Sequence, residues 1–106
     1  MKLIIKKETA TWYGQTRPHT SAMIQSKTNF KEGKFEIRAK FPAGKGFWPA
    51  LWMWGLDEID IAEFNGKDKN VMVHVCHWNR CNNAVCNNES TSGLMDYTQD
   101  FHIYSV

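Results

Sequence analysis

Three acidic residues, Glu58, Asp60 and Glu63, lie close together in an otherwise mainly apolar stretch of the chain. Like charges at neighbouring positions on one face destabilise a sheet, so stability alone does not explain this arrangement. Glycoside hydrolysis uses two carboxyl groups, one ionised as the nucleophile and one protonated as the acid. A third acid between them can hold a proton or a hydrogen bond and separate the two pKa values. A solvated acidic strand face is the competing interpretation.

The spacing of these acids predicts a strand with one irregularity. Side chains of a strand point alternately to its two faces, and acidic and apolar residues alternate from Glu58 to Ile61. Strict alternation would turn Glu63 toward the apolar face, where an unpaired carboxylate is very costly. One extra residue, in a β-bulge at Ile61 and Ala62, restores the parity. The sequence therefore predicts all three acids in a row on one face.

Three tryptophans share one parity in the preceding segment, residues 47–54, which also has the pattern of a strand. Trp48, Trp52 and Trp54 are therefore expected on one face. Pro49 lacks an N–H donor, which suits the start of a strand or a sheet edge. Indole rings either fill a core or stack on sugars while offering one N–H donor. From the residues alone, a core layer is the more usual role and a sugar platform stays open.

The histidines and cysteines do not have the ligand spacing of a zinc site, so neither a metal nor a cofactor is expected. His77 is the second-to-last residue of a strand predicted over residues 71–78, where a lone histidine is more often structural. A local disulfide between Cys81 and Cys86 is feasible in an oxidising compartment, although it would leave Cys76 without a partner.

The remaining segments predict short strands separated by polar turns. Strands are expected over residues 3–8, 35–41, 47–54, 71–78 and 101–106, with weaker alternation over 21–30. Residues 9–20 and 79–93 are expected to be loops. Trp12 and Tyr13, in the first loop, are expected to pack back on the core rather than to form a sugar-binding rim.

Length and composition exclude several classes of protein. The 106 residues allow one domain at most. A hydrophobic content of 42% and five tryptophans favour a globular core. The net charge of +2 is small and interspersed, so no nucleic-acid partner is expected. No apolar run of about 18 residues predicts a membrane helix, and the first residues do not form a signal peptide.

Five ordered segments resemble glycoside hydrolase family 16. The segment EIDIAE, at positions 58–63, matches the family signature E-I-D-x-x-E. Residues 33–42 (GKFEIRAKFP) and 44–53 (GKGFWPALWM) are similar to two family strands, and residues 20–27 and 100–106 resemble two more segments. The resemblance covers nearly the whole chain. It implies an all-β fold, an antiparallel β-sandwich of the jelly-roll, concanavalin A-like type.

The resemblance also implies catalytic roles. Glu58 corresponds to the nucleophile, Glu63 to the acid/base, and Asp60 to the bridging acid that holds the charge state of the nucleophile. The implied activity is a glycoside hydrolase that retains anomeric configuration. Such pairs of carboxyl groups lie about 5–5.5 Å apart.

Substrate-binding roles follow from the same resemblance. Trp48 and Trp52 match family positions that line the cleft, and Trp54 is a looser match because the loop after it is short. His77 fits the histidine that lies near the acid/base glutamate. The expected partner is a polysaccharide, with β-1,3- or mixed β-1,3-1,4-glucan (laminarin-like) the first expectation. An agar- or carrageenan-type galactan hydrolase, a non-catalytic β-glucan-binding module and an inactive fragment remain as alternatives.

Domains of this family are typically more than twice as long as this chain. Residues 1–106 are therefore expected to be an N-terminal part of a catalytic domain that lacks its C-terminal strands. The resemblance implies a secreted or cell-surface protein.

Overall fold

The part of the chain that the structure describes is built from β-strands and their connections. A computed structural model describes residues 1–55, 57–78, 87–92 and 95–106. They divide into two compact units, Met1–Glu32 and Gly33–Val106. The paired strands are antiparallel, which confirms the predicted all-β class. In chain order the strands are β1 (Ala10–Trp12), β2 (Gln15–Arg17), β3 (Glu36–Ala39), β4 (Ala50–Trp54), β5 (Glu58–Phe64), β6 (Val71–His77), β7 (Asn87–Ser92) and β8 (His102–Ser105).

The first unit contains a hairpin of β1 and β2. Both turn residues, Tyr13 and Gly14, have positive φ angles of 46° and 72°, as tight hairpin turns require. The side chains of Trp12 and Tyr13 are 76% and 91% exposed and form an edge-to-face pair. The prediction that they pack on a core is therefore wrong within this unit, because β1 and β2 form a short hairpin with no buried face of its own.

A further prediction fails in the same unit. The expected strand over residues 3–8 is reduced to a single antiparallel bridge between Lys6 and Thr20. Residues 21–30 form no strand. Leu3, Ile4 and Ile5 are all at least two-fifths exposed. Apolar residues of the right pattern do not make a strand where the described chain offers no neighbouring strand to pair along their length.

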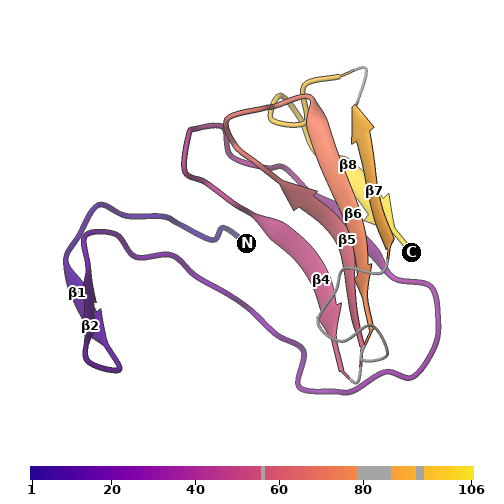
Figure 1. The fold of residues 1–106 in the computed structure, drawn as a ribbon, viewed down its shortest axis with the longest axis horizontal. Helices are drawn as coiled ribbons and strands as arrows, with labels where there is room; N and C mark the ends of the chain where they lie inside the picture. Colours follow the sequence, from indigo (N-terminus) through magenta and orange to yellow (C-terminus); the bar gives the residue numbers. More distant parts are fainter. Residues whose placement is uncertain (56, 79–86, 93–94) are drawn as a thin grey trace. The chain divides into compact units, whose positions relative to one another are not determined.

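The second unit contains two sheets (Figure 1). The larger sheet has the order β4-β5-β6-β7, and the smaller one pairs β3 with β8. The strands predicted over 35–41, 47–54, 71–78 and 101–106 are confirmed with slightly shorter bounds. The loop predicted over 79–93 is wrong for Asn87–Ser92, which pairs with β6. The edge of β6 presents backbone N–H and C=O groups, and a strand of any sequence can pair with them through its own backbone. Pairing of β7 therefore needs no apolar alternation.

A core lies between these two sheets. Phe41 stacks on Phe64 with ring centroids 5.6 Å apart, and Phe41 also contacts Tyr104 of β8 at 5.1 Å. The buried cluster draws on both sheets, which makes this unit a two-layer sandwich. Burial of its apolar side chains supplies the main stabilisation of the fold. The cluster consists of Phe41, Ile61, Ala62, Phe64, Met72 and Tyr104.

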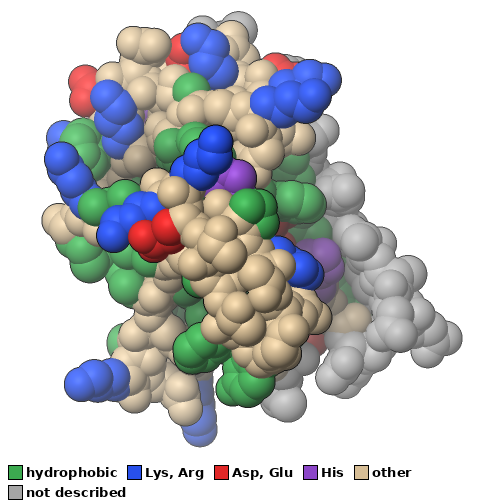
Figure 2. All heavy atoms as spheres, turned by 90° about the vertical axis from the view of Figure 1, so that its left-hand side faces the viewer, with side chains coloured by type: hydrophobic (Ala, Val, Ile, Leu, Met, Phe, Trp, Pro, Cys, Tyr) green, Lys and Arg blue, Asp and Glu red, His purple; other side chains and the backbone are tan. Residues whose placement is uncertain are grey.

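Among the described residues seen in Figure 2, Lys and Arg side chains lie among hydrophobic and other groups. That distribution agrees with the small net charge of +2. Among the described residues, no helix has the length and apolar character needed to cross a membrane.

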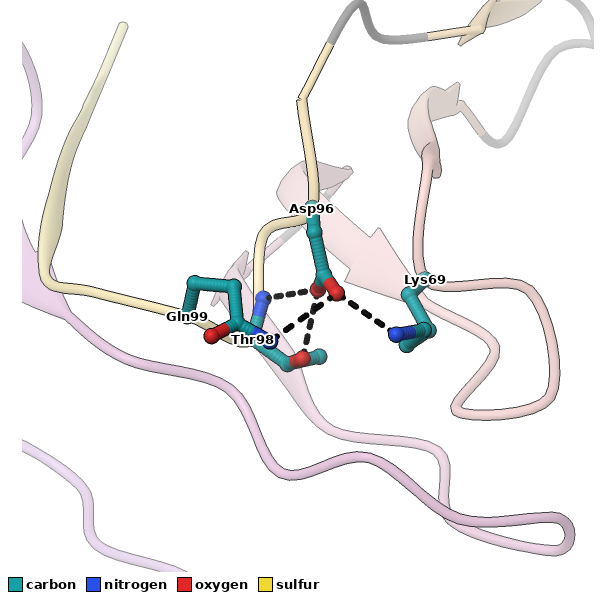
Figure 3. Close-up of polar contacts among 4 residues, drawn as sticks. All are labelled: Lys69, Asp96, Thr98 and Gln99. Atoms are coloured by element: carbon teal, nitrogen blue, oxygen red, sulfur yellow. Dashed lines mark hydrogen bonds and ion pairs between the residues drawn. The ribbon is translucent and has the colours of Figure 1, made fainter.

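Asp96 joins the segment before β8 to the turn after β5 (Figure 3). Its carboxylate accepts a hydrogen bond from the Lys69 ammonium at 2.7 Å and bonds from the Thr98 backbone N–H and hydroxyl. The Gln99 side-chain amide donates a further bond at 3.2 Å. The Lys69 contact, followed by those of Thr98, holds the pKa of the Asp96 carboxyl well below its usual range.

We expect Asp96→Asn to reduce stability at neutral pH and to weaken its dependence on acid. Because the pKa of Asp96 is lower in the folded than in the unfolded chain, its carboxylate stabilises the fold above about pH 4, and the contribution is lost as the pH falls further. Urea unfolding at about pH 7 and about pH 3 measures the difference. Asp100→Asn is the matched control, since the Asp100 carboxylate accepts a hydrogen bond from the backbone N–H of the adjacent Phe101. An equal effect of Asp96→Asn at both pH values would contradict the assignment.

Candidate active site

The β-bulge predicted at Ile61 and Ala62 is present in β5. Asp60 pairs with Val75 of β6, and Glu63 pairs with Val73, so two residues of β5 oppose the single residue between those valines. The pairing of β5 with β4 shifts at the same place. Ile61 and Ala62 are buried in the core. The bulge thus returns Glu63 to the face of β5 that carries Asp60.

Two tryptophans of β4 share this face with the acids. Trp54 is directly opposite Glu58, and Trp52 is directly opposite Asp60. Residues directly opposite one another in an antiparallel pair have neighbouring side chains on the same face. Trp54 is 71% exposed and Trp52 40%, and their rings meet edge to face with centroids 5.8 Å apart. The interpretation of these residues as a core layer is therefore wrong.

Trp48 precedes β4 and contacts the third acid. Its indole Nε1–H donates a hydrogen bond to Glu63 Oε1 at 3.1 Å, while the side chain stays 75% exposed. The segment that carries it is fixed against the end of β5, where Phe64 N–H donates to Pro49 O at 3.1 Å and Gly66 N–H to Phe47 O at 3.0 Å.

Glycine is needed at position 66 for this close approach. A side chain on Gly66 would collide with the carbonyl oxygen of Gly44 and the side chain of Phe47. Gly44 N–H also donates to Gly66 O at 2.9 Å. The absence of a side chain at Gly66 therefore allows the backbone contacts that bring Trp48 to Glu63.

The central acid, Asp60, is almost completely buried, with 4% of it exposed. His77 of β6 lies opposite Glu58 and donates from Nε2 to Asp60 Oδ2 at 3.0 Å. A buried carboxylate is very costly without a hydrogen-bonded partner, and this imidazole supplies one. His77 is thus in contact with the acidic row, as its position at the end of β6 allows.

The environment of Glu63 favours its protonated form. Partial burial, and next the negative charge of Asp60, raise the pKa of the Glu63 carboxyl above its ordinary value. The Trp48 hydrogen bond and His77 act in the opposite direction more weakly, and Glu58 adds a small upward contribution. A carboxyl group whose pKa is raised by burial and by a neighbouring carboxylate is suited to general acid catalysis.

Comparison with known proteins identifies the family. The whole chain, residues 1–106, matches the family described as Glycosyl hydrolases family 16. The chain belongs to glycosyl hydrolase family 16. Glucan endo-1,3-beta-glucosidase of Cryptopygus antarcticus is 32% identical over 99% of this chain and 44% of that protein. The laminarinase catalytic domain of Thermotoga maritima has a TM-score of 0.80 and 34% identity, over 97% of this chain and 47% of that one.

A second solved structure shows a relative with bound sugar. A variant of LamA from Zobellia galactanivorans, in complex with laminaritriose and laminaritetraose, has a TM-score of 0.79 and 33% identity. That match covers 95% of this chain and 50% of the other. This family 16 chain therefore spans half or less of the length of these relatives.

Two contacts of this candidate site were not predicted from the sequence. One is the Trp48–Glu63 hydrogen bond, since parity indicates a shared face but not which acid an indole reaches. The other is a hydrogen bond between His74 Nδ1 and the Ile61 carbonyl oxygen. The sequence signal for this second contact was the place of His74 opposite the predicted bulge.

Several further sequence predictions concern cysteines and metals. Cys81 and Cys86 lie outside the described residues, so their predicted disulfide stays a prediction. Cys76 is a half-buried free thiol. Within the described ranges, no cluster of three or more His, Cys, Asp or Glu side chains has the arrangement of a metal site.

Two substitutions are expected to move the pKa of Glu63 in opposite directions. Trp48→Phe removes a hydrogen bond to the ionised carboxylate and should raise the pKa, whereas Asp60→Asn removes a neighbouring negative charge and should lower it. Carbon-13 NMR titration of the Glu63 carboxyl measures both. Trp54→Phe is the matched control and should leave the value unchanged. Shifts of the same sign in Trp48→Phe and Asp60→Asn would refute this electrostatic account.

His77→Ala is expected to destabilise the fold by about 1–3 kcal/mol, the usual cost of removing one partner of a buried polar group. The substitution takes a donor from the buried Asp60 carboxylate. The free energy of urea unfolding at neutral pH is the measurement. His19→Ala, at an exposed histidine of the first unit, serves as the control. A loss no larger than that of the control would show that the His77–Asp60 contact contributes nothing to stability.

Proposed function

We propose that this chain carries the catalytic residues of a retaining endo-glycosidase that hydrolyses β-1,3- or mixed β-1,3-1,4-glucans. The observation that carries the proposal is the bulged row of Glu58, Asp60 and Glu63, in which Glu63 has a raised pKa. The family assignment and the names of the relatives support the same reaction. Since the chain spans half or less of those relatives, the activity proposed is that of the full-length gene product.

In the proposed mechanism, the Glu58 carboxylate attacks the anomeric carbon while the bond to the leaving oxygen breaks. Protonated Glu63 gives its proton to that oxygen, and a glycosyl–Glu58 ester forms. The Glu63 carboxylate next takes a proton from water, whose oxygen attacks the anomeric carbon and releases Glu58. Two displacements at one carbon retain its configuration. The two carboxyl groups are predicted to lie about 5–5.5 Å apart, as this mechanism requires.

Asp60 and His77 support this cycle without touching the leaving group. The Asp60 charge beside Glu63 favours the protonated acid before the first displacement. The His77 hydrogen bond keeps the Asp60 carboxylate oriented within the sheet. In this mechanism Glu58 is therefore the ionised carboxyl group, and Glu63 is the protonated one.

The exposed indoles are proposed to bind the sugar chain. Trp52 and Trp54 stand beside Asp60 and Glu58, and Trp48 stands beside Glu63. The three residues are 40–75% exposed, so glucose units can stack on their rings through C–H groups. A neutral glucan is favoured over a sulfated galactan because no basic residues cluster between positions 48 and 54. Because its substrate is a polymer, we further propose that the enzyme acts outside the cell or at its surface.

A glucan-binding role is the second candidate. A beta-1,3-glucan-binding protein of Penaeus monodon is 43% identical over 63 residues, which cover 48% of this chain. In such a module the tryptophans would bind the polysaccharide and no bond would be cleaved. The intact acidic row favours the hydrolase, since binding alone does not require a carboxyl group with a raised pKa.

The test is hydrolysis of laminarin by the full-length gene product and by Glu58→Gln. We expect the substitution to reduce kcat by about a thousandfold or more, because it removes the nucleophile. Proton NMR of the first product should show retained configuration. Glu36→Gln is the matched control, since Glu36 is exposed and pairs with Lys34 away from the acidic row. Laminarin binding without hydrolysis in the parent protein would favour the binding module, and undiminished hydrolysis by Glu58→Gln would remove Glu58 from the mechanism.

A further inference from the structure

The β-bulge of β5 faces a single histidine. Asp60 pairs with Val75 and Glu63 with Val73, so His74 lies opposite both Ile61 and Ala62. A bulge interrupts the regular ladder, and its backbone groups must find partners of other kinds. A contact that fixes the backbone at the bulge therefore also fixes the position of Glu63 relative to Asp60.

His74 provides such a partner with its side chain. Its Nδ1 lies 2.6 Å from the carbonyl oxygen of Ile61, and the contact is partly buried. A carbonyl oxygen can only accept a hydrogen bond, so the imidazole must carry a proton on Nδ1. The bond therefore joins the side chain of β6 to the first residue of the bulge in β5.

The contact between His74 and the Ile61 carbonyl lies in buried surroundings. Ile61 is 4% exposed and Ala62 is completely buried, so the bulge lies in the apolar core and not in solvent. A hydrogen bond lost at a buried carbonyl leaves an acceptor whose desolvation is not compensated. An imidazole donor at His74 thus favours the bulged backbone over alternatives in which the Ile61 carbonyl turns elsewhere.

We propose that His74 is a positioning residue, whose Nδ1–H holds the Ile61 carbonyl and thereby keeps the bulge that sets Glu63 in line with Asp60 and Glu58. The structural part of this proposal stands on the His74–Ile61 contact and the register. Its catalytic part rests on the proposed function, because it takes Glu63 as the acid/base.

The expected consequence follows from strand parity. Loss of the bulge would shift the part of β5 that follows it by one residue and turn its side chains to the opposite face, which would move Glu63 away from Trp48 and Asp60. Even a partial relaxation displaces the carboxyl group, and a misplacement of about 1 Å can cost roughly a hundredfold in rate. Because substrate would still bind to the tryptophans, the loss should fall on kcat and leave KM almost unchanged.

The experiment compares His74→Leu with His74→Asn in the full-length gene product. Leu removes the donor, whereas the Asn side-chain amide places an N–H at the position of Nδ1. We expect His74→Leu to lower kcat on laminarin by roughly ten- to a hundredfold with KM unchanged, and His74→Asn to restore most of it. Hydrogen exchange at the Ala62 and Glu63 amides should be roughly two- to tenfold faster in His74→Leu than in the parent or His74→Asn.

Met72→Ala is the control for general destabilisation, because Met72 is buried in the same strand and points into the core. It should reduce stability at least as much as His74→Leu while keeping kcat. Equal kcat losses in His74→Leu and His74→Asn, or in His74→Leu and Met72→Ala, would overturn the proposal. If the parent protein does not hydrolyse laminarin, the proposed function fails instead. Hydrogen exchange at the Ala62 and Glu63 amides then tests the positioning role by itself, and unchanged exchange in His74→Leu would overturn that role.

Discussion

Strand parity is the constraint on which the rest of this structure depends. The core face of β5 must carry apolar side chains, and the opposite face must carry the acids. A regular strand cannot satisfy both demands after Asp60, because Glu63 would be turned inward. The bulge at Ile61 and Ala62 resolves the conflict, since both bulge residues are buried while Glu63 returns to the acidic face.

The electrostatics of the site depend on that geometry. Placing Glu63 on the face of Asp60 adds a repulsive charge to the effect of partial burial, and together they raise the pKa of Glu63. The Trp48 indole works against this rise by donating to the ionised carboxylate. Asp60 tolerates its own burial through the bond from His77. Side chains from β6 and from the segment before β4 thus set the proton affinity of a residue in β5.

Backbone packing explains why an exposed indole can have a fixed place. Trp48 is three-quarters exposed, so its own burial cannot hold it. Hydrogen bonds from Gly66 and Phe64 anchor the chain on both sides of it, and the close approach requires a glycine at position 66. The aromatic face therefore combines solvent exposure, which the proposed polysaccharide substrate would need, with a defined position beside the acids.

Local alternation was enough to predict the strands that bear the site. It indicated the bulge, the common face of the acids and the shared face of Trp52 and Trp54, because side-chain direction in a strand depends on the backbone alone. It failed for residues 3–8, where the predicted strand is a single bridge, and for β7, whose pairing uses backbone groups of the β6 edge.

The sequence by itself determined the family, the class of fold and the order of the acids along β5. Tertiary structure alone decided which partner each side chain meets: Trp48 with Glu63, His77 with Asp60, and His74 with the Ile61 carbonyl. It also decided that the tryptophans of β4 face solvent rather than a core. The physical reason is that parity describes one strand, whereas contacts and pKa values arise from the register between strands and from the depth at which the sheets pack.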